Sequence, residues 1–309
     1  MENNNSNINN DLKKLLDNYL RKTDIFKFIN AIDKDNILES PAQAASEIDQ
    51  LQLDLEVSSG INNRVLVDKL ITLSEKMLNK DKFYHLLLDL SKMMTDNGEL
   101  NFAFEIAQDL INKIESSSNY TEIHAETESI ISKIYWCQAQ WEESEYHCEE
   151  AYKLFKLISK QSGYARCENM YGTLYGEKGE FIKAQDHFKK ALTYLNDDED
   201  ISLQAMILTN LGIINTINGN FEQAIWNHKN SIEKFEKLND LNRVARVYHN
   251  IGMLYTRMLK YDEALEEFNK CITVSLETNY LSNCAIAYIG KAYIYTKLNN
   301  QQLADAFTD

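Results

Sequence analysis

The sequence predicts an all-α solenoid, a stack of antiparallel helix pairs. The first observation is a set of small residues that recur 40 positions apart in the C-terminal half: Ser132, Gly172, Gly212, Gly252 and Ala292. The second is another small residue twelve positions after each of them: Ser144, Ala184, Ala224, Ala264 and Ala304. The third is the single proline, Pro41, because proline inside a helix costs about 3 kcal/mol and its scarcity permits long helices. Self-similarity at a fixed period indicates stacked supersecondary units, whose usual work is binding.

Close packing explains the small residues. Two antiparallel helices joined by a tight turn approach most closely at one crossing point, where only a residue with a small side chain fits on each helix. The expected turns are short and polar, as in residues 178–180 (KGE) and 218–220 (NGN). A third small position, seven residues after the second, would allow the next unit to dock: Ala151, Ala191, Ser231 and Cys271.

The first 80 residues lack this periodicity. Residues 1–10 are rich in asparagine and are predicted to be a disordered tail. Residues 11–80 are predicted to form an N-terminal helical segment, with helices over 11–32, from Pro41 to about Val57, and over 62–79. Ser40 can cap the second of these helices, and proline suits the first turn because its missing N–H group is not needed there.

Residues 81–309 are predicted to form the solenoid, with about six helix pairs. The last pair is shorter, because only the residues from Asn300 to Asp309 remain for its second helix. No polar capping helix follows, although solenoids normally seal their last apolar face in this way. We therefore expect either that the chain is a fragment of a larger polypeptide or that a partner covers this end. An open C-terminal end would also permit self-association.

Composition excludes several function classes. The net charge of −15 argues against a nucleic-acid binder, since phosphate binding needs a basic surface, and against an anionic membrane surface. Five cysteines without a CxxC pair indicate buried thiols in a reducing compartment. No apolar run reaches membrane-spanning length, and the N-terminus does not resemble a signal peptide. A cytoplasmic protein, or the cytoplasmic part of one, is expected.

The sequence carries no constellation typical of an enzyme or a cofactor site. Phosphate-binding glycine loops, the metalloprotease HExxH pattern and the GxSxG nucleophile pattern are absent from it. His147 and Cys148 are adjacent, but neighbouring helical residues point about 100° apart and no third metal ligand is evident. His147 and His187 are 40 apart, which predicts equivalent surface positions far from each other. We expect no catalysis, no metal and no cofactor.

The repeats resemble the tetratricopeptide family. The best copies are Gly172, Tyr175, Ala184, Phe188 and Ala191, and Gly252, Tyr255, Ala264 and Phe268 with Cys271 closing the second. The copy around Gly212 is weaker, with Asn215, His228 and Ser231 at three of its positions. The period of 40 is similar to the long-repeat subgroup of kinesin light chains and spindle-orientation adaptors. This resemblance implies a right-handed superhelix whose first helices line a concave groove for an extended peptide.

The resemblance also assigns groove positions: six and three residues before the small residue of each first helix, and one, four and five after it. Over the last four pairs these twenty positions hold four basic residues and one acidic residue, which favours a protein or peptide partner of acidic character. Asparagines two before the glycines could hydrogen-bond a peptide backbone. The candidate peptide-binding residues are Asn210, Asn250, Arg246, His249, Arg257 and Lys297.

Two functions follow from the resemblance and the missing catalytic residues. The first is a non-enzymatic scaffold that holds a peptide or protein segment in the groove. The alternative is a sensor or regulatory module of a larger signalling protein, whose catalytic or output domain is not part of this chain.

Overall fold

The computed structural model describes residues 63–114, 118–196, 200–278 and 280–307, together with Leu12, Leu15, Asn18 and Tyr19. These residues are helical or lie in turns, and the described part of the chain contains no strand, which confirms the all-α class. The predicted tail 1–10 and the helix predicted from Pro41 to Val57 lie outside the described residues. So does most of the helix predicted over 11–32.

The chain divides into two compact units, Met1–Ile158 and Ser159–Asp309. Unit 1 contains α4 (Asn63–Met77), α5 (Lys80–Asp96), α6 (Leu100–Ile114), the short 3₁₀ helix η1 (Ser118–Tyr120), α7 (Thr121–Cys137) and α8 (Trp141–Leu157). The helix predicted over 62–79 is α4. Helix α5 packs against α6, and α7 packs against α8. The core of this unit includes Leu70, Leu86, Leu90 and Leu110, all fully buried.

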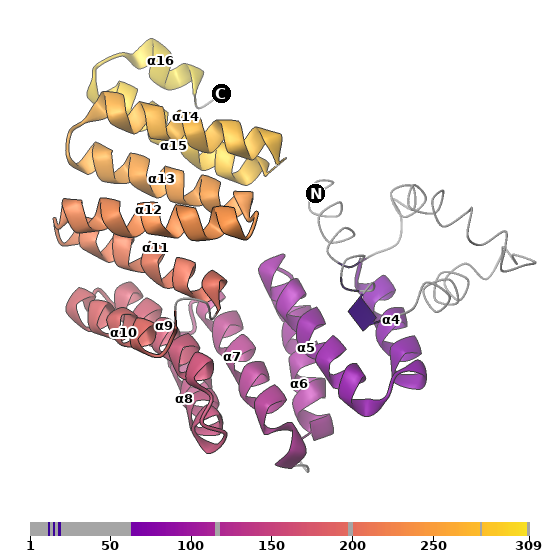
Figure 1. Cartoon of the computed structure of the whole chain (residues 1–309). Helices are drawn as coiled ribbons and strands as arrows, with labels where there is room; N and C mark the ends of the chain where they lie inside the picture. The colour runs from indigo at the N-terminus through magenta and orange to yellow at the C-terminus, as the bar shows by residue number, and fades with distance from the viewer. Residues whose placement is uncertain are drawn as a thin grey trace, which may run out of the picture. The chain divides into compact units, whose positions relative to one another are not determined.

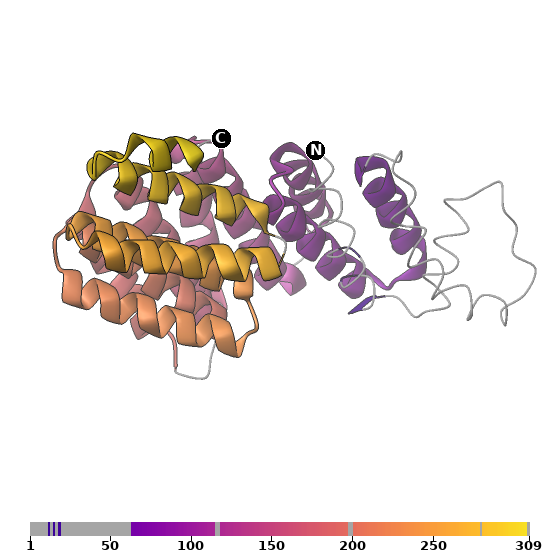
Figure 2. The ribbon, with the colours of Figure 1, turned by 90° about the horizontal axis from the view of Figure 1, so that it is seen from above.

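Unit 2 is a stack of four helix pairs in chain order (Figures 1 and 2). The pairs are α9 (Gln161–Glu177) with α10 (Phe181–Thr193), α11 (Ile201–Ile217) with α12 (Phe221–Lys237), α13 (Leu241–Arg257) with α14 (Tyr261–Glu277), and α15 (Leu281–Lys297) with α16 (Gln301–Ala306). With α5/α6 and α7/α8 of unit 1, the described residues hold six helix pairs. Helix α16, the second helix of the last pair, is the shortest of the second helices.

The small residues meet where the sequence places the helix crossings. In unit 1, the Ser132 hydroxyl donates to the Ser144 carbonyl at 2.8 Å, and the Ser144 hydroxyl donates to the Ser132 carbonyl at the same distance. In unit 2, the glycines of the first helices face an aromatic ring of the second helix: Gly172 faces Phe188 and Gly252 faces Phe268. The 40-residue period is therefore the period of a steric contact.

Each turn within a pair contains one residue with a left-handed backbone. In the α9–α10 turn this residue is Gly179, with φ of +76°, and the next N–H group, that of Glu180, donates to the Tyr175 carbonyl at 2.8 Å. A bond of this kind satisfies a carbonyl that the helix end would leave free, and glycine adopts positive φ without a steric penalty. This geometry reverses the chain within three residues and makes the antiparallel pair.

Candidate functional site

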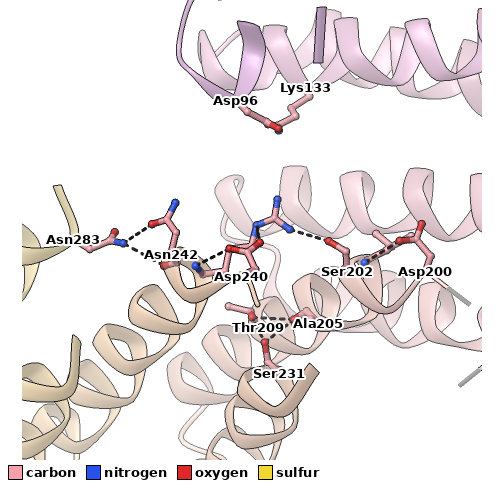
Figure 3. A network of polar contacts seen from close by, with 12 residues as sticks. Asp96, Lys133, Asp200, Ser202, Ala205, Thr209, Ser231, Asp240, Asn242 and Asn283 are labelled. Carbon is pink, nitrogen blue, oxygen red and sulfur yellow. Dashed lines mark hydrogen bonds and ion pairs between the residues drawn. The ribbon is translucent and has the colours of Figure 1, made fainter. Parts of the chain in front are cut away.

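The first helices of unit 2 lie next to one another in series, since α9 contacts α11, α11 contacts α13, and α13 contacts α15. Polar side chains 41 residues apart join them. Asn210 donates to Asn169 Oδ1 at 3.1 Å, Arg243 donates to Ser202 Oγ at 2.9 Å, and Asn283 donates to Asn242 Oδ1 at 2.6 Å. Figure 3 shows Asn283 turned toward Asn242, with Asp240, which caps the same helix as Asn242, lying between Asn242 and Ser202. These contacts fix the spacing of the surface that the four helices share, which we name the first-helix face.

An apolar row follows this face. Ile213 on α11, Met253 on α13 and Tyr293 on α15 are 38%, 42% and 50% exposed, and each directly follows the small residue of its helix. Ile289, one turn before Tyr293, is 63% exposed. Large apolar side chains aligned on neighbouring helices leave an apolar surface in water, and such surfaces mark interaction sites.

Three cations flank the apolar row. Arg246 lies in the second turn of α13, Arg257 ends that helix, Lys297 ends α15, and all three are exposed. None of them forms an ion pair with a carboxylate among the described residues, although the chain holds 47 acidic residues. Lys297 Nζ lies 5.2 Å from the centre of the Tyr293 ring. The face therefore combines apolar contact area with positive charge that the described part of the chain does not neutralise.

A model of the tetratricopeptide repeat matches residues 124–197 and 203–277. These residues form tetratricopeptide repeats. Repeats of this type generally serve as scaffolds that bind other proteins, and their motif residues are packing residues. No curated protein sequence matches the chain.

Solved structures share the tetratricopeptide fold with this chain at low identity. A Rap protein complexed with Competence and Sporulation Factor is 14% identical with a TM-score of 0.62, covering 99% of this chain and 96% of its own. Aspartyl phosphate phosphatase F from Bacillus subtilis is 17% identical with a TM-score of 0.56, covering 99% and 92%. BtubC (BKLC) from P. vanneervenii is 20% identical with a TM-score of 0.55, covering 69% and 86%. At these identities the likeness shows the fold alone.

The predicted site residues of the tetratricopeptide groove divide into two groups. Arg246, Arg257 and Lys297 are exposed on the first-helix face, whereas Asn210, Asn250 and His249 are half-buried. The amide of Asn210 already donates to Asn169, so one of its donors is used within the stack. The side chain of Asn250 makes no hydrogen bond to any described residue. Ligand contact by any of the six stays a prediction.

The imidazole of His249 is more buried than that of a surface histidine. Its Nδ1 atom is buried without a hydrogen-bond partner among the described residues, and its ring lies 5.4 Å from the ring centre of Phe268. Burial lowers the pKa of this imidazole below its usual value of 6.5, so the ring is neutral at neutral pH. The ring therefore adds no charge to the face.

Two further groove positions of the resemblance are corrected by the structure. Thr216 and Thr256 are buried, and their hydroxyls donate to the carbonyls of Gly212 and Gly252 at 2.8 Å. A threonine hydroxyl commonly satisfies the carbonyl four residues before it in a helix, so these hydroxyls are used within their own helices. The apolar row lies at positions that the resemblance assigns to the groove, one after each small residue and, for Ile289, three before it, although none of the row is among the six candidate residues.

The two periodic histidines, His147 and His187, occupy equivalent and partly exposed positions, and each has a glutamate partner. Nδ1 of His147 lies 2.6 Å from Glu128 Oε2 in unit 1, and Nδ1 of His187 lies 2.6 Å from Glu168 Oε2 in unit 2. Burial raises the pKa of Glu128, but hydrogen bonds from His124 and His147 outweigh it and lower that pKa overall. The described residues contain no group of three potential metal ligands.

A polar cleft of about 800 Å³ lies at the start of unit 2, away from the apolar row. Its lining includes Lys160, Arg166, Tyr194 and Asp200. Arg166 and Asp200 face each other across 3.4 Å, so their charges largely offset one another. Among the described helices, none is both long and apolar enough to span a membrane.

Proposed function

We propose that the first-helix face of unit 2 binds an extended peptide segment of a partner protein, one that carries apolar side chains and net negative charge. The apolar row with its unpaired cations supports this proposal most directly. Arg246, Arg257 and Lys297 keep their charges exposed in a chain with a net charge of −15, where carboxylate partners are abundant. Acidic side chains of a ligand would supply the missing partners and speed the encounter.

The repeat spacing suits an extended ligand. Packed helices lie about 8–10 Å apart, and an extended chain advances about 3.3 Å per residue, so successive first helices meet about every third ligand residue. Ile213, Met253 and Tyr293 supply one apolar side chain on each of three successive first helices. One structural neighbour, the Rap protein, is complexed with Competence and Sporulation Factor. That complex is a precedent for ligand binding by a protein with this fold.

The test is a charge reversal on the face with a matched reversal elsewhere. A fluorescein-labelled peptide, selected from a random linear display library on the wild-type protein, serves as the probe in fluorescence anisotropy. Arg246→Glu with Arg257→Glu should weaken its affinity at least tenfold, because two attractive charges become repulsive, which corresponds to about 1.4 kcal/mol or more. Binding should also lose most of its dependence on salt.

The control makes the same change of charge on a second helix. Lys229→Glu with Lys237→Glu alters two exposed lysines of α12, which does not belong to the first-helix face. This control should bind the probe as wild type does, and circular dichroism should show both variants folded. An equal loss of affinity in both variants would show that the change in net charge alone causes the effect. Unchanged affinity in the Arg246→Glu, Arg257→Glu variant would show that the peptide binds elsewhere.

A sensor module is the second candidate. A signal-transduction ATPase from Pyrococcus horikoshii, described as having a tetratricopeptide repeat sensor, aligns with 96% of this chain at 15% identity and a TM-score of 0.60. The alignment covers 44% of that larger protein, and this favours a repeat region working with an output domain. Small-angle scattering with and without the selected peptide separates the two candidates, since a sensor should change its dimensions and a rigid scaffold should not.

A further inference from the structure

One turn residue of unit 2 departs from the other three. The turns within the pairs of unit 2 place one residue each at positive φ: Gly179, Gly219, Leu259 and Asn299; in unit 1, Gly98 and Ala139 hold the same conformation. Glycine adopts this conformation freely and asparagine tolerates it, but a leucine Cβ crowds the following carbonyl oxygen. Leu259 holds φ at +60°. Its backbone is therefore strained where a glycine or an asparagine would not be.

The side chain of Leu259 gains no packing that would offset this strain. It is 71% exposed, so most of its apolar surface is in contact with water. A residue that is unfavourable in both backbone and side chain is more often found where a partner makes use of it, and strained backbone gathers at ligand-binding sites. The position itself points to a contact that the chain does not make internally.

The neighbouring turn also places an exposed leucine beside a cation, here with an ordinary backbone conformation. Leu298, at the end of α15, is 48% exposed and directly follows Lys297. Leu259 stands two residues after Arg257. Both cations are exposed and lack an ion pair among the described residues. We name these four residues, Arg257, Leu259, Lys297 and Leu298, the turn edge; it adjoins the C-terminal ends of α13 and α15 and continues the first-helix face.

We propose that the turn edge is a second contact surface for the same acidic peptide. The ligand leaves the first-helix face at the ends of α13 and α15, places an apolar side chain against Leu259 and Leu298, and sets carboxylates against Arg257 and Lys297. This inference rests on the proposed function. Charge complementarity and continuity with the face identify the occupant as part of that peptide.

Exposed leucines beside cations could also bind an anionic membrane. Asp262 and Glu263 are exposed in the first turn of α14, three and four residues after Leu259. Glu263 pairs with Lys260 at 3.9 Å, and Asp262 would be repelled by lipid headgroups. A peptide can direct its carboxylates to Arg257 and Lys297 and avoid that turn. The peptide is therefore the occupant that we argue for.

The test is Leu259→Asn, which keeps the turn geometry because Asn299 holds the same conformation one repeat later. With the library-selected fluorescein peptide, the affinity should fall about tenfold, as for the loss of one buried leucine contact. The urea midpoint of the free protein should rise at the same time. Leu276→Asn is the control: this leucine is 57% exposed on α14, outside the turn edge, and its loss should leave the affinity unchanged.

The outcomes are distinguishable from failure of the proposed function. If Leu259→Asn binds as wild type does while Arg246→Glu loses affinity, the turn edge is wrong and the first-helix face stands. If the library yields no peptide, both proposals fail. If the protein instead binds phosphatidylglycerol vesicles and Leu259→Asn abolishes that binding, the occupant is a lipid surface and the inference is overturned.

Discussion

Replacing Gly252 with alanine should lower the free energy of unfolding by about 3 kcal/mol, the upper end of the usual cost of overpacking a core. A Cβ atom at this position would lie 2.6 Å from Cε1 and 2.7 Å from Cδ1 of Phe268. Carbon atoms do not approach this closely, so the helices α13 and α14 must separate or the ring must move. Urea unfolding followed by circular dichroism measures the loss.

The Phe268 ring has no room to move away. It is fully buried, and on α15 Gly290 faces the same ring, where an added Cβ would lie 2.5 Å from Cζ. The ring is therefore held between two glycines of successive first helices. A smaller side chain should relieve the contact, so Phe268→Leu should recover part of the stability in the Gly252→Ala background and lower it in the wild type.

Gly176→Ala is the matched control within the same kind of helix. Its nearest neighbour would be Ile214 Cδ1 at 3.8 Å, an ordinary contact. Alanine inside a helix is favoured over glycine by about 1 kcal/mol, so this variant should be as stable as wild type or more stable. A Gly252→Ala protein as stable as Gly176→Ala would show that the crossing point can open without cost.

The sequence predicted the crossing points because their cause is steric and repeats with the chain. Ser132 and Ser144 are twelve residues apart in the sequence and hydrogen-bond each other's backbone in the structure. A tight turn fixes how many residues separate the two sides of a crossing, so spacing alone identifies the contact. The helix pairs follow from the same geometry.

Side-chain partners at the candidate site could not be predicted in this way. Register placed Thr216 and Thr256 on the groove, but both are buried within the stack, and their hydroxyls are used by carbonyls of their own helices. The repeat register also placed Asn210 on a first helix, but it could not show that the amide of Asn210 donates a hydrogen bond to Asn169. A 40-residue period gives the direction of a Cα–Cβ bond, whereas rotamers and neighbours across the stack decide what the side chain contacts.

His228→Phe should raise the free energy of unfolding by about 1–3 kcal/mol at neutral pH. His228 takes the place that Phe188 and Phe268 hold in the adjacent repeats, and its ring packs on Gly212 as theirs pack on Gly172 and Gly252. It is fully buried, and neither ring nitrogen has a hydrogen-bond partner among the described residues. A buried polar group left unpaired costs about 1–3 kcal/mol, and phenylalanine removes that group.

The same variant should remove part of the protein's sensitivity to acid. Burial lowers the pKa of His228 from 6.5 to about 4, so between these values the unfolded chain binds a proton that the folded protein does not. Unfolding then takes up a proton, and stability falls as the pH is lowered through 6.5 toward 4. The full effect corresponds to about 3 kcal/mol. Above pH 6.5 both states are neutral and this contribution is constant.

Urea titrations of both proteins at several pH values between 7.5 and 4 isolate this effect, since all other titrating groups are shared. The difference in stability between His228→Phe and wild type should widen steadily as the pH falls below 6.5. A difference that stays constant over this range would show that His228 is protonated, or reaches water, in the folded protein. A phenylalanine variant less stable than wild type would mean that the second repeat of unit 2 has adapted its packing to the smaller ring.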